Sequence, residues 1–298
     1  MKNILPKILV ILGPTATGKS DLAVEIAQRF NGEIISADSR QVFKDMDLGT
    51  GKITKKEMLG VKHYMLDIVK PNTKYNVAKY QKEVHGIIAD ILGRDKLPII
   101  CGGTGFYIQA IVDNVIFPEV KSDEKLRVKL EKLTTNKLLI ILEKLDKNTF
   151  NRIDKNNRVR IVRAIEIAKT LGFVPPIKKD IKYNSLQLGL DANDEILKDR
   201  IHKRLIKRLD NGMLKEVSKL HSQSVTWKRL ENFGLEYRYL ALYLQKKITH
   251  EQMINELCMA IWHFAKRQRT WFKRDNRIKW FKLEDKKEII KTIDQFML

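Results

Sequence analysis

Cysteine is scarce in this sequence: Cys101 and Cys258 are the only two among 298 residues, and they lie far apart. Two distant thiols do not form the disulfide framework of a small secreted domain, so we expect both to be reduced in a cytoplasmic protein. Long apolar runs are also missing. The run at 7–12 is too short for a signal peptide, and no stretch reaches the ~20 apolar residues of a membrane helix.

Paired metal ligands are absent as well. None of the six histidines stands at metal-ligand spacing from another histidine or a cysteine, which argues against a zinc site. Acidic residues are outnumbered: 36 Asp and Glu face 57 Lys and Arg, giving a net charge of +21. This excess favours a polyanionic partner such as nucleic acid. A merely solvated lysine-rich surface remains an alternative, while an anionic membrane is disfavoured because no amphipathic anchor or lipidation signal is present.

Apolar patterning predicts strands that alternate with helices. The runs 7–12 (KILVIL), 33–37 (EIISA) and 97–101 (LPIIC) are typical of buried parallel strands, and 19–30 and 77–92 have helical periodicity. The length suits one large domain or a core with a smaller one. We therefore expect an α/β fold with a parallel sheet.

The composition changes near Phe117, where the chain becomes rich in lysine and asparagine and mostly helical in pattern. We expect a helical insertion at 114–183, with the core formed by 1–113 and 184–298. A strand at 185–190 is followed by a helix for which Asp194 is a plausible N-cap. A further helix begins at Thr249, which has capping-box spacing to Gln252.

A phosphate-binding loop lies between the first strand and the first helix. Its residues fit the pattern G-x4-G-K-[ST]: Gly13, Pro14, Thr15, Ala16, Thr17, Gly18, Lys19 and Ser20. Glycines let backbone N–H groups turn toward phosphate oxygens, and the helix N-terminus adds partial positive charge. Lys19 would hold phosphate as a point charge, and the Ser20 hydroxyl would bind Mg²⁺.

The phosphate loop lacks the acidic partner of a typical P-loop ATPase. The strand at 97–101 ends in Gly102, Gly103 and Thr104 rather than in a carboxylate. Asp38 instead follows the strand at 33–37, at the carboxyl edge where open α/β sheets bind ligands. Asp38 is therefore a candidate general base, with an ordinary loop aspartate as the alternative.

Taken together, the motifs resemble one family, the tRNA dimethylallyltransferases. The similarity runs over nearly the whole chain: GPTATGKS at 13–20, ISADSRQVFKDMDLGTGK at 35–52, HYMLDIV at 63–69, YNVAKYQ at 75–81, GGTGFYIQA at 102–110, RAIEI at 163–167, DRIHKRL at 199–205 and AKRQRTWFKRD at 265–275. The sequence departs from the family pattern at Ile53, where proline is usual, and at the GLEYR segment, 234–238.

The resemblance implies a fold, a reaction and a set of roles. The fold is a P-loop NTPase-like core, and the loop binds the diphosphate of dimethylallyl diphosphate with Mg²⁺ as cofactor. Asp38 matches the general base, Arg204 an arginine for donor binding and catalysis, and Thr104 a catalytic or substrate-contacting position. Contacts with the tRNA anticodon stem-loop are implied at these positions: Asp38, Ser39, Arg40, Gln41, Thr104, Arg127, Val159, Arg160, Arg163, Gly234, Tyr237, Arg238, Lys266, Arg267, Gln268, Arg269, Trp271, Lys273 and Arg274.

The chemistry of such a transfer requires these residue types. The exocyclic amine of adenine is a poor nucleophile, so a carboxylate that removes its proton is needed, and the leaving diphosphate needs cations where charge develops. Arg204 can hold phosphate oxygens with two donors, although its spacing from Arg200 and Arg208 also fits a solvent-exposed helix face. The cations and aromatics at 266–274 suit single-stranded RNA, or a basic helix end whose aromatics pack inward.

Three other functions remain open from the sequence. A P-loop kinase would use Lys19, Ser20 and Mg²⁺ for ATP but leaves the charge of +21 unexplained. An RNA-binding protein with a relic P-loop would bind tRNA without needing Asp38. A free-adenylate isopentenyltransferase would have no use for the basic surface. We expect the tRNA enzyme, acting on adenosine 37 of tRNAs that read UNN codons, as a monomer without a membrane partner.

Overall fold

The computed structural model describes residues 5–298, and the chain forms two compact units. The larger unit contains the chain up to Asn114 together with Ile181–Leu298, and the smaller unit is Val115–Asp180. The sequence placed this insertion at 114–183. In the part of the chain that the structure describes, no helix is both long and apolar enough to cross a membrane.

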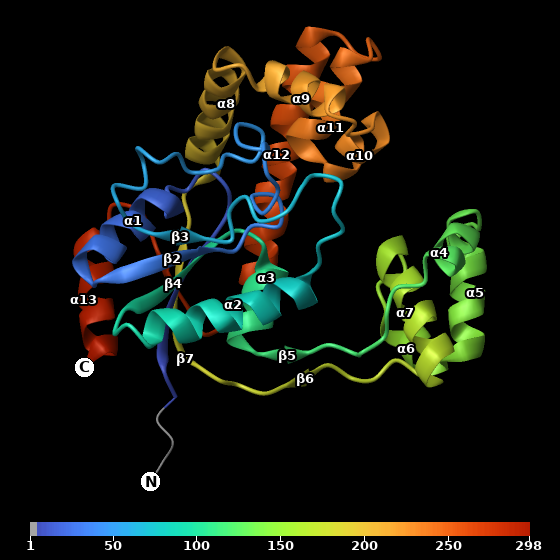
Figure 1. The fold of residues 1–298 in the computed structure, drawn as a ribbon, viewed down its shortest axis with the longest axis horizontal. Coiled ribbons are helices and arrows are strands. Elements are labelled where there is room, and N and C mark those ends of the chain that lie inside the picture. The colour runs from blue at the N-terminus through green and yellow to red at the C-terminus, as the bar shows by residue number, and fades with distance from the viewer. Residues whose placement is uncertain (1–4) are drawn as a thin grey trace. The chain divides into compact units, whose positions relative to one another are not determined.

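A six-stranded sheet forms the centre of the larger unit (Figure 1). Its order is β3-β2-β4-β1-β7-β8, and every neighbouring pair is parallel. The strands are β1 (Lys7–Leu12), β2 (Gly32–Ser36), β3 (His63–Tyr64), β4 (Leu97–Gly102), β7 (Asn184–Leu190) and β8 (Ile278–Phe281). The predicted parallel α/β class is confirmed. The carboxyl ends of β1, β2 and β4 lie next to one another because these strands are neighbours in the sheet.

Both faces of the sheet are buried, as the apolar runs of the strands require. Alternate residues of β1 face opposite sides, since side chains point alternately up and down along a strand. Ile8 and Val10 pack with α2 (Val77–Leu92) and α3 (Gly105–Val112), whereas Leu9 and Ile11 pack with α1 (Lys19–Arg29) and α13 (Lys286–Met297). Helices therefore cover the sheet on two sides (Figure 1).

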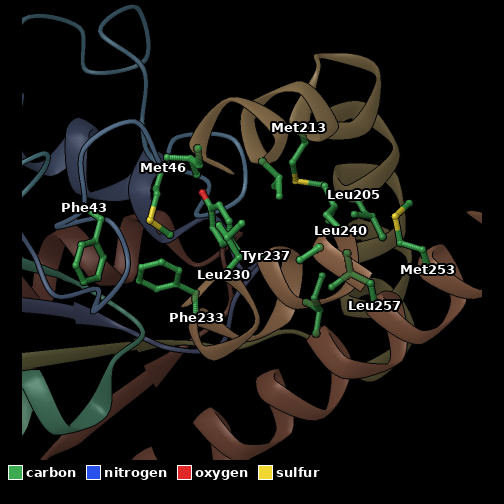
Figure 2. Packing of buried hydrophobic residues seen from close by; sticks show 14 of the residues in the cluster. Phe43, Met46, Leu205, Met213, Leu230, Phe233, Tyr237, Leu240, Met253 and Leu257 are labelled. Carbon is green, nitrogen blue, oxygen red and sulfur yellow. The ribbon is translucent and has the colours of Figure 1, made fainter. Parts of the chain in front are cut away.

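Five further helices build a second hydrophobic cluster beside the sheet. They are α8 (Asp194–Asp210), α9 (Met213–Ser222), α10 (Trp227–Phe233), α11 (Leu235–Leu244) and α12 (His250–Phe272). Phe43 and Met46, from the loop after β2, are buried in this cluster with Phe233 and Tyr237 (Figure 2). The loop that follows the β2 carboxyl end is thus anchored by the C-terminal third of the chain.

Several local details differ from the sequence predictions. Asn193, not Asp194, caps α8, because its side chain accepts from the Ile196 N–H. The predicted strand at 33–37 begins and ends one position earlier, at Gly32–Ser36. Strands β3 and β8 and the helices α9 to α11 were not predicted. The capping box of α12 at Thr249 and Gln252 is present as predicted.

The smaller unit is a bundle of short helices with its own apolar core. It contains α4 (Glu124–Glu131), α5 (Thr135–Leu145), α6 (Lys147–Arg152) and α7 (Arg158–Leu171). Leu138, Leu142, Ile161 and Ile165 are fully buried among these helices. Two strands that the sequence analysis missed, β5 (Val115–Ile116) and β6 (Lys178–Lys179), pair antiparallel where the chain enters and leaves the bundle.

Candidate active site

The phosphate-binding loop joins β1 to α1 in a tight turn that requires two glycines. Gly13 has φ 142°, and a Cβ there would lie 2.1 Å from the Leu190 carbonyl oxygen. Gly18 has φ 87° and caps α1. Both positions favour glycine because side chains rarely adopt this backbone, and at Gly13 the neighbouring strand β7 also leaves no space. The loop is closed internally by Thr17, whose Oγ1 donates to the Pro14 carbonyl at 3.0 Å.

Lys19, the first residue of α1, folds back over this loop. Its Nζ donates to the Pro14 carbonyl and lies 3.5 Å from Thr17 Oγ1. Burial lowers the pKa of the Lys19 ammonium to about 8. Within residues 5–298 the ammonium makes no ion pair, so its charge is available to a phosphate group.

Arg204 brings a second cation to the loop. Its Nη2 donates to Thr15 Oγ1 from helix α8, so the side chain reaches the phosphate loop instead of solvent. Burial lowers the pKa of the Arg204 guanidinium to about 10, which leaves it charged at neutral pH. Lys19 and Arg204 therefore approach the same loop from two different helices.

Asp38 lies two residues beyond β2 and shapes the turn that follows it. Its Oδ1 accepts from the Arg40 N–H at 2.7 Å and from the Gln41 N–H at 3.3 Å. In the described chain no donor bonds Oδ2, so one carboxylate oxygen is left for a substrate. Asp38 and the phosphate loop follow the carboxyl ends of β2 and β1, the two parallel neighbours of β4, so both lie at the same edge of the sheet.

Thr104 connects the end of β4 to this turn. Its Oγ1 accepts from the Ser39 N–H at 3.1 Å, and its N–H donates to the Ala37 carbonyl at 3.1 Å. Thr104 thus joins the carboxyl ends of β4 and β2. The phosphate loop follows the end of β1, the other neighbour of β4.

The turn at 38–41, predicted to contact tRNA, is partly buried. The Arg40 guanidinium lies 5.6 Å from the centre of the Phe233 ring, and burial lowers its pKa. The Gln41 side chain accepts from Ser36 Oγ at 2.8 Å and donates to the Gly51 carbonyl at 3.3 Å. The Gln41 side chain and the backbone N–H groups of residues 39–41 are therefore bonded within the chain.

Sequence reasoning missed two residues that hold the loop after this turn. Glu216 accepts from the backbone N–H groups of residues 47, 48 and 49 at 2.9, 2.7 and 3.0 Å, and from the Tyr237 hydroxyl at 2.7 Å. The side chain of Lys52 is 5% exposed and pairs with Asp47 and Asp67 at 2.6 and 2.5 Å. No local sequence signal distinguishes Glu216 from a surface glutamate.

The C-terminal residues predicted to contact tRNA fall into two groups. Lys266, Arg267, Lys273 and Arg274 are exposed on α12 or directly after it. The others are engaged inside the protein: Gln268 is buried, Arg269 pairs with Asp191 and Asp194 at 2.9 and 2.7 Å, and Trp271 packs against Gly105. The interpretation that the aromatics pack while cations remain outside fits this arrangement.

The remaining residues predicted to contact tRNA also differ in their exposure. Arg238 is exposed, Gly234 adopts φ 78° before α11, and Tyr237 is buried on Glu216. In the smaller unit, Val159 and Arg160 are exposed on α7.

The two other arginines of the smaller unit that were predicted to contact tRNA, Arg127 and Arg163, are held by one buried carboxylate. Arg127 binds Glu166 with two donors at 2.7 and 2.8 Å, and Arg163 adds a third at 3.2 Å. These ion pairs lower the pKa of Glu166 against the effect of burial. They fix α4 to α7 within the unit.

Residues 5–298 contain no cluster of three or more carboxylates, histidines or cysteines that could hold a metal ion by themselves. Hard oxygen donors at the loop include the exposed Ser20 hydroxyl at the start of α1 and the hydroxyl of Thr15. Such a sparse set of hard oxygen donors fits Mg²⁺, which keeps several waters and is bound largely through substrate phosphates.

The phosphate loop and the strand order place the larger unit among proteins with a P-loop NTPase-like fold. A tRNA isopentenylpyrophosphate transferase of known structure from Bacillus halodurans is 33% identical, with a TM-score of 0.75 over 97% of this chain and 96% of that one. The corresponding Staphylococcus epidermidis enzyme is 34% identical, with a TM-score of 0.71 over 97% and 99%. A eukaryotic dimethylallyltransferase crystallised while acting on tRNA is 28% identical, with a TM-score of 0.76 over 89% of this chain and 69% of that one.

Sequence comparisons agree with the structural ones. The IPP transferase family profile matches residues 41–275. A tRNA dimethylallyltransferase from Caldanaerobacter subterraneus is 39% identical over 94% of this chain and 93% of its own length, and one from Halothermothrix orenii is 39% identical over 98% and 94%. The chain belongs to the IPP transferase family of tRNA dimethylallyltransferases. The predicted fold class, enzyme class and family are therefore confirmed, and the kinase alternative is not favoured.

Proposed function

We propose that this protein transfers a dimethylallyl group from dimethylallyl diphosphate to the N6 amine of adenosine 37 in tRNAs that read UNN codons, releasing diphosphate. One observation supports this most directly: within residues 5–298 no hydrogen-bond donor reaches Oδ2 of Asp38, at the same edge of the sheet as the phosphate loop, where the two cations Lys19 and Arg204 meet. The transfer needs a base and an anion site close together, and these residues supply both.

The reaction has a simple balance of bonds. The bond between carbon 1 of the prenyl group and the diphosphate oxygen breaks, and its electron pair leaves with the diphosphate. A bond between that carbon and N6 forms, and the amine proton passes to Asp38. Negative charge grows on the leaving oxygen, where the loop amides, Lys19 and Arg204 stabilise it. The poor nucleophilicity of the amine makes the base worth roughly 10²–10⁴-fold in rate.

Mg²⁺ is part of the proposal. The Ser20 hydroxyl would contribute one ligand, and the diphosphate and water would provide the rest. When bound, the ion supplies positive charge to the leaving diphosphate. The β4 end, Gly102 to Thr104, carries no carboxylate for the metal of a nucleoside triphosphate.

The tRNA would be bound by basic surface and by shape. Lys266, Arg267, Lys273 and Arg274 form an exposed cationic group around the end of α12, and we assign them to the phosphates of the anticodon stem-loop. We assign the smaller unit, with Val159 and Arg160 exposed, to the same RNA. The target base must leave its stack to reach Asp38, as other base-modifying enzymes require. We propose action as a monomer in the cytoplasm, where tRNA is processed.

The test is transfer of label to unmodified tRNA. The pure protein is incubated with Mg²⁺, labelled dimethylallyl diphosphate and the tRNA, in parallel with Asp38→Ala. We expect label in tRNA from the wild type and a loss of at least ~100-fold in the variant.

Each alternative predicts a different result. Undiminished labelling of tRNA by Asp38→Ala would support the reaction but show that Asp38 is not its general base. ATP-dependent labelling of a small acceptor would point to a kinase. Tight tRNA binding without transfer would indicate an RNA-binding protein, and label on free AMP instead of tRNA would indicate a free-adenylate enzyme.

A further inference from the structure

Gln268 occupies an unexpected position for a residue in a basic, RNA-like segment. It lies on α12 between exposed Lys266 and Arg267 and partly buried Arg269, yet it is only 7% exposed. The helix turns this one side chain inward, toward the ends of β1 and β4. A buried side-chain amide has to find partners for both its oxygen and its nitrogen.

Both partners of Gln268 are backbone groups of the active-site loops. Its Oε1 accepts from the Thr15 N–H at 2.9 Å, and its Nε2 donates to the Gly103 carbonyl at 2.9 Å. Thr15 belongs to the phosphate loop, and Gly103 precedes Thr104. One planar amide therefore fixes the separation between the loop that holds diphosphate and the loop next to the base.

The contact continues on both sides into groups that take part in the proposed reaction. On one side, the Thr15 hydroxyl accepts from Arg204. On the other side, Thr104 accepts from the N–H of Ser39, the neighbour of Asp38. Hydrogen bonds and the peptide bond from Gly103 to Thr104 thus connect the leaving-group arginine to the turn that carries the base, and Gln268 lies in the middle of this series.

We infer that Gln268 is a positioning residue, which sets the distance between donor diphosphate and general base and makes no contact with tRNA. The inference rests on the proposed transfer reaction. It assigns Gln268 a role different from the tRNA contact predicted at this position. A shift of about 1 Å between reacting groups can lower a rate by up to about 10²-fold, so the effect should appear in kcat.

Gln268→Glu tests the amide with little change of shape. The carboxylate can still accept from Thr15 but cannot donate to Gly103, whose carbonyl it then faces. At pH 8 we expect kcat to fall about tenfold or more, with the dissociation constant for tRNA within about twofold of wild type. A protonated glutamate regains a donor, so the ratio of variant to wild-type kcat should rise toward one as pH falls.

Gly103→Ala disturbs the contact between Gln268 and Gly103 by a change in the acceptor residue. A Cβ at Gly103 would lie 2.2 Å from Gln268 Nε2, so the amide has to move. We expect the same fall in kcat at unchanged tRNA affinity. The matched control is Gly86→Ala, because in the described chain a Cβ there meets nothing within 4 Å beyond its own stretch of helix. In a double variant with Gln268→Ala the two losses should not add, since the smaller side chain leaves space for the methyl group.

The outcomes separate this inference from the function on which it rests. No transfer by the wild type would overturn both. Transfer by the wild type with unchanged kcat in Gln268→Glu and Gly103→Ala would overturn the positioning role alone. Weaker tRNA binding at wild-type kcat would make Gln268 an RNA contact, and a lower Tm at wild-type kcat would make it a structural brace; either result overturns the inference. If Gln268→Glu does not fold, Gly103→Ala decides.

Discussion

Two carboxylates lie near opposite ends of strand β2, and their hydrogen bonding differs. Glu33, near its start, is 3% exposed and accepts from Arg94 Nη1 and Nη2 at 2.7 and 2.6 Å, from Lys96 at 2.8 Å and from the Tyr64 hydroxyl at 2.7 Å. Asp38, beyond its end, accepts two backbone N–H groups on Oδ1, and no donor among residues 5–298 bonds its other oxygen.

The cations show the same contrast. Arg94 and Lys96 are committed to Glu33. Among residues 5–298, Lys19 has neutral oxygens of its own loop as its hydrogen-bond partners, and Arg204 has a threonine hydroxyl. A structural charge is saturated by its partners because burial otherwise costs several kcal/mol. A group that acts on a substrate has to keep some hydrogen-bonding capacity unused. This unused capacity distinguishes the carboxyl edge of the sheet, with Asp38, from the amino edge, with Glu33, more clearly than charge or burial does.

The largest expected effect comes from the isosteric change Asp38→Asn. The amide oxygen can still accept from the Arg40 N–H, so the turn should fold, but the amide cannot take a proton. We expect kcat/KM for prenyl transfer to fall by about 10²–10⁴-fold, with the free energy of unfolding changed by less than about 0.5 kcal/mol. Rates and urea denaturation are measured on the same preparation. A large loss of stability would mean that Asp38 is structural like Glu33.

The matched change at the other edge, Glu33→Gln, should give the reverse. An amide nitrogen would face donors of Arg94, Lys96 and Tyr64, so we expect a loss of about 2 kcal/mol in the free energy of unfolding and unchanged kcat. The ion pairs hold the pKa of Glu33 well below its usual range. This stability is therefore present above the unfolded-state pKa and lost as pH falls toward the folded-state pKa. Urea denaturation at pH 7 and pH 4 should show the difference from wild type narrowing in acid; a constant difference would contradict it.

The smallest effect concerns the pH dependence of donor capture. Lys19 has a pKa of about 8 in the free enzyme because burial disfavours its charge. The ammonium is present below that pH and lost above it, so kcat/KM for dimethylallyl diphosphate should fall about tenfold per pH unit above about pH 8. Lys19→Arg is the control, since a guanidinium stays charged and the fall of kcat/KM above pH 8 should disappear. A flat wild-type profile to pH 10 would contradict the assignment.

Features carried by short stretches of sequence were predictable. The phosphate loop, the strands at 7–12 and 97–101 and the helix at 77–92 depend on local pattern, and the structure contains all of them. Strand β3 has two residues, and β8 is the four-residue segment IKWF, so neither has enough length for a periodic signal.

The contacts of Gln268 and Glu216 could not be predicted from the sequence for a different reason. Gln268 lies in a cationic helix and was predicted to contact RNA, but the direction in which a helix turns one side chain depends on what it packs against. Glu216 binds three backbone groups that are 167 to 169 positions earlier in the chain. Contacts over such separations leave no trace in local composition, whereas the family resemblance could predict roles for Asp38 and Arg204 because it compares whole patterns.

The position of Glu216 and Gln268 has a consequence for how the protein matures. Thr15 emerges early from the ribosome, while Gln268 follows it by 253 residues. The N-terminal strands and α1 can collapse as they appear, yet the loops around Asp38 cannot take their final arrangement until α9 and α12 have been synthesised. Contacts so distant in sequence form late and slowly in folding. A nascent chain would thus display its phosphate loop long before it is able to carry out chemistry, and catalytic competence should appear abruptly once α12 has been synthesised.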